Sequence, residues 1–99
     1  MLRKPYHIFF QHLASPIKIE IITALKEKQM SVSELAKKIG VEQSKLSHAL
    51  ASLRYCTIVQ VKQKGKKRIY SLNKKTILPI LKILDKHRRE FCKKNGSLS

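Results

Sequence analysis

The sequence predicts a mainly α-helical domain with a small β-hairpin, in the order helix, helix, helix, helix, strand, strand, helix. Apolar residues recur at helical spacing in five segments, which predicts five amphipathic helices. Two short β-branched segments flank a glycine-containing turn, which is typical of a hairpin. The length of 99 residues suits one domain. We expect residues 1–99 to form it, with 95–99 as a frayed tail.

The first two helices are predicted on either side of Ser15. Residues 5–14 place Tyr6 and Leu13 on one side of a short helix. Ser15 and Pro16 are a cap residue and a proline in the first helical position, so a second helix should start there and run to about Lys28. The next two residues, 29–30, are expected to be a connector.

Two further helices are predicted in close succession. Ser31 and Glu34 have the S-x-x-E spacing of a capping box, and Gly40 is a typical helix-ending residue. After Val41 and Glu42 a new helical pattern begins. Its buried stripe is expected to consist of Leu46, Leu50 and Leu53, with Ala49 beside it.

The spacing of apolar residues then changes. Residues 58–61 and 69–72 are predicted as strands around Gly65. The last helix is expected from Thr76 to about Lys93. If Thr76 caps this helix, Pro79 falls in the first turn, where proline is tolerated; if Asn73 caps it, Pro79 should kink the helix.

The charge is strongly unbalanced. Twenty-two lysines and arginines against six acids give a formal net charge of +16. Residues 1–57 carry nine basic and four acidic side chains, whereas residues 58–99 carry thirteen and two. Such an excess favours a polyanionic partner, above all nucleic acid.

Other classes of protein are disfavoured. No apolar run approaches the roughly 18 residues of a membrane span, and the N-terminus lacks the features of a signal peptide. Two cysteines are too few for a disulfide scaffold, and three glycines form no phosphate-binding loop. No nucleophile, base or paired acids suggest catalysis. We expect a cytoplasmic, nucleoid-associated protein that is not an enzyme and needs no cofactor or membrane.

The segment 31–54 predicts a helix-turn-helix, because two helices are joined by about three residues. In that motif the second helix enters the major groove of DNA. Its polar side chains are suited to bases and phosphates. The predicted DNA-binding residues here are Gln43, Ser44, Lys45, Ser47, His48 and, at the helix end, Arg54. The alternative is an ordinary solvated helix face.

The hairpin that follows carries a cluster of cations. A hairpin after a helix-turn-helix is a wing, and a cationic wing can lie along phosphates or enter the minor groove. The predicted phosphate-binding residues are Lys62, Lys64, Lys66, Lys67 and Arg68. A hairpin whose charges only favour solubility is the alternative.

These residues together resemble the ArsR/SmtB type of winged helix-turn-helix transcriptional regulator. The resemblance covers residues 13–72 without gaps and includes LASPIKIEII, SVSELA, QSKLSHALASLR and KGKKRIYSL. Three residues depart from the family pattern. Lys18 replaces the usual arginine, Glu42 the usual capping serine, and Thr57 the glycine after the recognition helix. The last two are expected to alter the two ends of that helix.

The resemblance implies a homodimer joined through the first and last helices. The apolar residues expected at that interface are Phe9, Phe10, Ile77, Ile80, Leu81 and Leu84. They offer more apolar surface than a small core needs, although packing within one chain is the alternative.

Many members of the family release DNA in response to metals or oxidants. The usual cysteine pair is missing, and Asp85 and His87 supply only half of the site known on the last helix, so no metal is expected. Cys56 is predicted to be a small core side chain. Cys92, beside two lysines, is a possible redox sensor, but the second cysteine typical of such sensors is missing.

The predicted function is therefore that of a sequence-specific, double-stranded DNA-binding regulator, a homodimeric repressor. Two alternatives remain open from sequence. One is a sequence-independent nucleoid or RNA-binding winged-helix protein, and the other is a protein-interaction module whose charge confers solubility.

Overall fold

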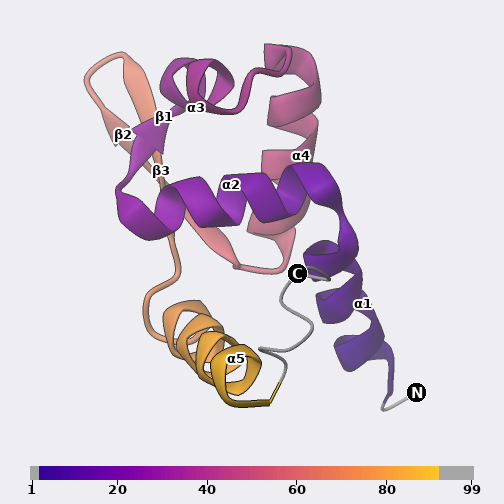
Figure 1. The fold of residues 1–99 in the computed structure, drawn as a ribbon. Coiled ribbons are helices and arrows are strands. Elements are labelled where there is room, and N and C mark those ends of the chain that lie inside the picture. Colours follow the sequence, from indigo (N-terminus) through magenta and orange to yellow (C-terminus); the bar gives the residue numbers. More distant parts are fainter. Residues whose placement is uncertain (1–2, 92–99) are drawn as a thin grey trace.

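Five helices and three short strands make up residues 3–91, the part of the chain that the computed structural model describes (Figure 1). In chain order they are α1 (Arg3–Ala14), α2 (Pro16–Glu27), β1 (Met30–Ser31), α3 (Val32–Ile39), α4 (Gln43–Tyr55), β2 (Val59–Lys64), β3 (Lys67–Leu72) and α5 (Ile77–Phe91). The predicted order is confirmed, with β1 as the one addition.

Strand β1 corrects the expected connector at residues 29–30. Met30 pairs with Tyr70 and Ser31 with Ile69, both antiparallel, so the hairpin is part of a three-stranded sheet in the order β1-β3-β2. A strand of two residues has no periodic pattern of its own, and only its partner strand reveals it.

The helix boundaries follow the local signals closely. The side chain of Ser31 accepts a hydrogen bond from the Glu34 N–H while the Glu34 carboxylate accepts one from the Ser31 N–H, so the capping box is confirmed. Gly40 ends α3 in the left-handed conformation, at φ 81°. Helix α5 starts after Thr76, which puts Pro79 in its first turn. Ser15 precedes α2 as expected but makes no side-chain capping bond.

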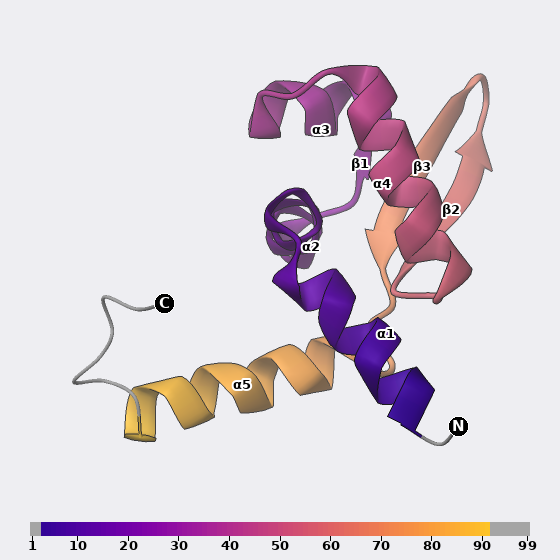
Figure 2. The same cartoon turned by 90° about the vertical axis from the view of Figure 1, so that its right-hand side faces the viewer.

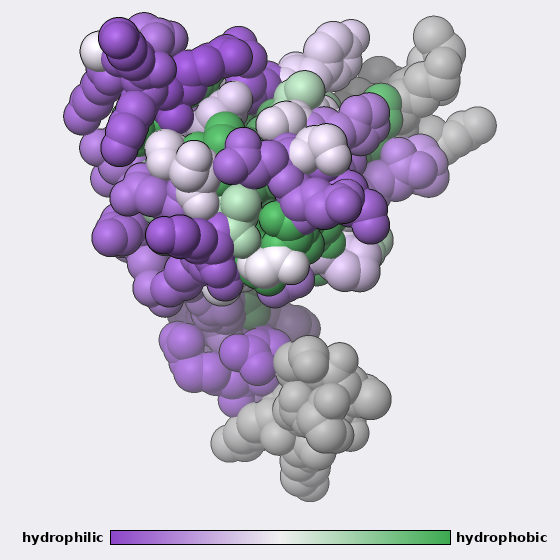
Figure 3. Space-filling model, turned by 90° about the horizontal axis from the view of Figure 1, so that it is seen from above, coloured by the Kyte–Doolittle hydropathy of each residue, from purple (hydrophilic) through white to green (hydrophobic). Residues whose placement is uncertain are grey.

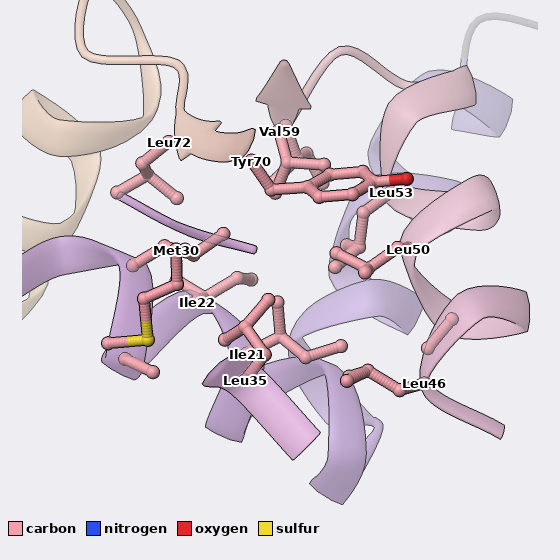
Figure 4. Packing of buried hydrophobic residues seen from close by; sticks show 14 of the residues in the cluster. Ile21, Ile22, Met30, Leu35, Leu46, Leu50, Leu53, Val59, Tyr70 and Leu72 are labelled. Atoms are coloured by element: carbon pink, nitrogen blue, oxygen red, sulfur yellow. The ribbon is translucent and has the colours of Figure 1, made fainter. Parts of the chain in front are cut away.

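The core lies between α2, α3, α4 and the sheet. Ile21 of α2, Leu35 of α3 and the α4 stripe Leu46, Leu50 and Leu53 are fully buried, so the predicted stripe is confirmed. Figure 4 shows Val59 and Tyr70 of the sheet beside Leu53. This core fixes the position of α4 relative to the β2–β3 hairpin.

Helices α1 and α5 lie at the opposite end of the molecule from α3 and the tip of the β2–β3 hairpin (Figures 1 and 2). Ile77 at the start of α5 is only 5% exposed and belongs to the core. An ion pair of 2.9 Å between Lys26 Nζ and Asp85 Oδ2 joins α2 to α5 farther along. The hydrogen bond from Lys26 is the main cause that lowers the pKa of Asp85.

Within residues 3–91, no single helix is long and apolar enough to cross a membrane. The segments Tyr6–Ala14 and Pro16–Glu27 meet that criterion only when taken together, and they are bent by 85°.

Candidate DNA-binding surface

Helix α4 presents all of its predicted DNA-binding residues to solvent. Its apolar stripe packs into the core, and the opposite side is therefore free. The exposed residues of the prediction are Gln43, Ser44, Lys45, Ser47, His48 and Arg54. None of them is acidic, which is the composition required for contact with DNA.

The centre of this exposed face runs along Ser44, His48, Ala51 and Tyr55, which follow one another at spacings of three or four residues. Tyr55 is 91% exposed, the highest value among the large apolar side chains whose burial the structure describes. Tyr55 is not among the residues predicted from sequence to contact DNA, although its spacing from Ala51 places it on the same face. Small residues at 44 and 51 allow the helix backbone to approach a groove closely.

A groove of about 730 Å³ separates the start of α2 from the first half of α4. Ser44, Lys45 and His48 line one side of it, and Ser15 and Lys18 line the other. Lys18 Nζ donates a hydrogen bond of 3.0 Å to Ser52 Oγ and so ties α2 to α4. Ser15 and Lys18 are thus candidate contact residues that the sequence analysis did not identify.

The wing ends in a two-residue turn, because Lys64 and Lys67 face each other at the last paired position. Gly65 has φ 62°, and Lys66 has no positive φ. Glycine in the first central position is typical of a type II′ turn, whose twist matches that of the flanking strands. The turn places Lys66 at the tip of the wing.

Strand alternation divides the wing cations between two faces. Lys62 pairs with Ile69 and Lys64 with Lys67, and these residues share the outer face of the hairpin. Arg68 pairs with Gln63 and shares the other face with the buried Tyr70. The sequence had grouped the five cations together, whereas the register separates Arg68 from Lys62, Lys64 and Lys67.

None of these cations forms an ion pair within the described residues, where the single ion pair is that between Lys26 and Asp85. Lys64 and Lys67 stand directly opposite each other, and such like-charged pairs destabilise a hairpin. Seen from the end that carries the wing and α3, the surface is mostly hydrophilic (Figure 3). The unpaired charge makes this end a strong candidate for binding a polyanion.

The end of α4 keeps a left-handed residue although threonine replaces the family's usual glycine there, so the helix end does not change as the substitution suggested. Thr57 has φ 56°, and within residues 3–91 it is the one non-glycine residue with a positive φ. A β-branched residue in this region is strained. Glu42, at the other end, precedes α4 but makes no side-chain capping bond.

Comparisons with known proteins agree with this geometry. The sequence model described as "Bacterial regulatory protein, arsR family" matches residues 15–61, from the start of α2 into the wing. The HTH-type transcriptional regulator Rv0081 of Mycobacterium tuberculosis is 37% identical over 79 residues, which span 79% of this chain and 69% of that protein. The chain belongs to the ArsR family.

Other relatives support the assignment. The HTH-type transcriptional regulator NmtR of M. tuberculosis is 40% identical over 62 residues, or 63% of this chain and 52% of NmtR. The crystal structure of Rv0081 superposes with a TM-score of 0.86 at 32% identity and covers 96% of both chains. That of NolR from Sinorhizobium fredii gives 0.76 at 29% identity, over 84% of this chain and 83% of NolR. This ArsR-family protein is thus a winged helix-turn-helix transcriptional regulator.

A second surface of this ArsR-family protein is apolar. Helices α1 and α5 enclose a groove of about 510 Å³ lined by Tyr6, Phe9, Phe10, Ile80, Ile83 and Leu84. Tyr6 is 70% exposed, Phe10 58% and Ile83 67%. Tyr6 and Ile83 are not among the interface residues predicted from sequence. The predicted place of Ile77 at the dimer interface is corrected, because its side chain is buried in the core. Leu81 packs partly against the core as well.

Asp85 and His87, the candidate effector residues on α5, contact other side chains in the structure. Asp85 is paired with Lys26, and the His87 ring packs on Phe91 at 4.9 Å between centroids. Among the described residues no group of three or more histidine, cysteine or acidic side chains is placed to hold a metal. Cys92, the predicted redox sensor, lies outside the described residues. Cys56 is half-buried rather than a fully enclosed core residue.

Proposed function

We propose that this chain is a homodimeric repressor that binds specific double-stranded DNA. The proposal rests on two surfaces that lie side by side, the exposed face of α4 and the wing. The exposed face of α4 is polar and only weakly cationic, whereas the wing is strongly cationic and forms no ion pair in the described part of the chain. In this arrangement α4 reads bases in the major groove, and the wing binds phosphates or the minor groove.

The relatives support the repressor role. A protein of Synechocystis that is described as a transcriptional repressor SmtB homolog is 29% identical over 82 residues, or 83% of this chain and 62% of that protein. We extend that role to this chain. The reading residues are Ser44, Ser47 and His48, flanked by Gln43 and Lys45, and Tyr55 extends the same face.

Dimerisation is proposed through α1 and α5. Phe10 and Ile83 expose large apolar side chains on the two sides of one groove, and a second copy of the same surface would cover them. A solved winged-helix domain from Mycobacterium bovis, Mb0332, is described as homodimeric. Such a dimer places two copies of α4 on half-sites about 34 Å apart, or a multiple of that distance.

The proposal is tested by selecting bound sequences from random duplex DNA and then measuring affinity against salt. If about six to eight phosphates are neutralised per dimer, the logarithm of the association constant should fall with that of salt at a slope of about −5 to −7. Affinity for the selected operator should exceed that for random duplex by at least about 10³-fold. A ratio near one would instead indicate a sequence-independent nucleoid or RNA-binding protein, and no binding at physiological salt would indicate a protein-interaction module.

Residue substitutions separate base reading from phosphate binding. His48→Ala should reduce the preference for the operator, whereas Lys66→Ala should weaken binding to all duplexes similarly and reduce the salt slope by about one. For the dimer, Ile83→Glu should yield a monomer by light scattering. Gln63→Glu, which adds the same charge on the wing, should remain dimeric.

A further inference from the structure

A histidine and a cysteine that are 44 residues apart in sequence meet where α1 approaches the end of α4. His12 is 95% buried, and its Nε2 lies 3.1 Å from the Sγ of Cys56. Cys56 is a free, half-buried thiol. The sequence analysis had no signal for this pair, because it expected Cys56 to be a packing residue.

The second nitrogen of the ring sets this contact apart from ordinary packing. His12 Nδ1 is buried and has no hydrogen-bond partner among the described residues. A buried polar atom without a partner destabilises the folded state, and such groups occur at sites of chemistry. The ring is thus placed at the thiol without satisfying its own hydrogen-bonding capacity.

The pair has the geometry of a nucleophile beside a base. In the tautomer that carries hydrogen on Nδ1, the thiol of Cys56 donates its proton toward Nε2 of His12. Burial, and next the charge of Lys18, lower the pKa of His12, so the neutral ring is the form that faces the thiol, and in this tautomer its Nε2 carries the free lone pair. The thiolate is the reactive form of cysteine, and an adjacent base produces it on demand.

We propose that Cys56 is a site of oxidation by small hydroperoxides, with His12 as the base. As the thiol proton passes to Nε2, the sulfur attacks one peroxide oxygen, forming an S–O bond and breaking the O–O bond. The leaving alkoxide or hydroxide takes the proton from His12 and departs as alcohol or water. The product is a sulfenic acid. A small oxidant is indicated because Cys56 is half-buried and its Sγ lies against a buried ring.

Cys56 lies close to three helices, α1, α4 and the start of α5. Cys56 is the C-cap residue of α4. The next residue, Thr57, accepts a hydrogen bond from Asn73, just before α5. An oxygen added to Sγ replaces the S–H donor that meets His12 Nε2 at 3.1 Å, so oxidation alters the contact that joins α1 to the end of α4. The consequence for DNA affinity rests on the proposed function, whereas the oxidation itself does not.

The oxidation is tested with the full chain carrying Cys92→Ser, which leaves Cys56 as the single thiol. The protein is exposed to hydrogen peroxide with dimedone, and the adduct is located by peptide mass spectrometry. Cys56 in the folded protein should be labelled at least tenfold faster than in the same protein unfolded in urea. Equal or slower labelling of the folded protein would overturn the proposal.

The role of His12 is tested by His12→Gln, which keeps a hydrogen-bonding side chain of similar reach but has no basic nitrogen. Labelling should slow at least tenfold while circular dichroism shows an unchanged fold, and an unchanged rate would contradict the role of the base. If this variant fails to fold, the comparison of folded with urea-unfolded parent still decides whether the site is reactive.

The link to DNA is measured separately by fluorescence anisotropy. Oxidation of the Cys92→Ser protein should weaken operator binding at least fivefold, reversibly with dithiothreitol, and Cys56→Ser should abolish the effect. Labelled protein with unchanged affinity would overturn the link to DNA. A parent protein that binds no duplex would refute the proposed function and leave the labelling result as it stands.

Discussion

The side-chain amide of Asn73 donates a hydrogen bond of 3.0 Å to the backbone carbonyl of Thr57. Asn73 follows β3, the last strand of the wing, and Thr57 follows α4, the recognition helix. This bond therefore links the C-terminal ends of the helix and the wing. The same asparagine accepts a hydrogen bond from the Lys75 N–H through its Oδ1. The bond thus holds a strained residue in place where the recognition helix, the wing and α5 converge.

Thr57→Gly should stabilise the protein. At φ 56° a threonine is strained by about 1 kcal/mol or more, and glycine adopts this conformation freely. Because glycine also makes the unfolded chain more flexible, we expect a net gain of about 0.5–1 kcal/mol in the free energy of unfolding. Urea denaturation measures it. Thr57→Val, which keeps the branched side chain, should show no gain, and a lower midpoint for Thr57→Gly would contradict the strain.

Glu42→Ser should stabilise α4 and strengthen DNA binding. Glu42 precedes the helix without capping it, whereas a serine there can accept a hydrogen bond from the first turn, which contributes about 0.5–1 kcal/mol. The change also removes a negative charge from the vicinity of the phosphates. Denaturation and anisotropy measure the two effects. Glu42→Gln removes the charge without supplying a good cap, so it should improve affinity alone; identical behaviour of the two variants would argue against capping.

Lys64→Glu should change stability and DNA affinity in opposite directions. A glutamate at 64 faces Lys67 across the hairpin, and replacing a like-charged pair by an ion pair contributes about 0.2–1 kcal/mol. DNA affinity should nevertheless fall, with the salt slope reduced by about one for each lost phosphate contact in the dimer. The matched control, Lys86→Glu on α5, should leave the salt slope nearly unchanged. An unchanged slope in Lys64→Glu would mean that this lysine does not contact phosphate.

Stability should depend on pH through His12. Burial, followed by the charge of Lys18, lowers the pKa of the folded-state imidazole below its ordinary value of 6.5. The unfolded chain then binds the proton more tightly than the folded protein. His12 therefore does not lower the free energy of unfolding above about pH 6.5, and the free energy of unfolding falls as the pH drops below that value. Thermal unfolding between pH 8 and pH 5 measures it. His12→Gln should flatten this part of the profile, and the same slope in both proteins would assign it to other groups.

The sequence alone predicted the features that depend on residues close to one another along the chain. The capping box of Ser31 and Glu34 and the helix end at Gly40 each lie within a few residues, so their signals survive without the fold. The same holds for the exposed face of α4, because a helix of fixed period with its leucines buried leaves only one side free. The resemblance of residues 13–72 pointed to the family, but it left open whether Thr57 keeps the left-handed backbone of the usual glycine, and the structure shows that it does.

The tertiary structure decided the contacts between distant segments. Strand β1 exists only because Met30 and Ser31 pair with β3, and Ile77 is buried only because the start of α5 packs on the core. Nothing near His12 in sequence indicates that it meets Cys56, and Lys26 reaches Asp85 across 59 residues. Local propensity acts over one turn or one hairpin, whereas these contacts depend on the packing of whole elements. The charge of +16 pointed to DNA, and the fold showed which cations share a face.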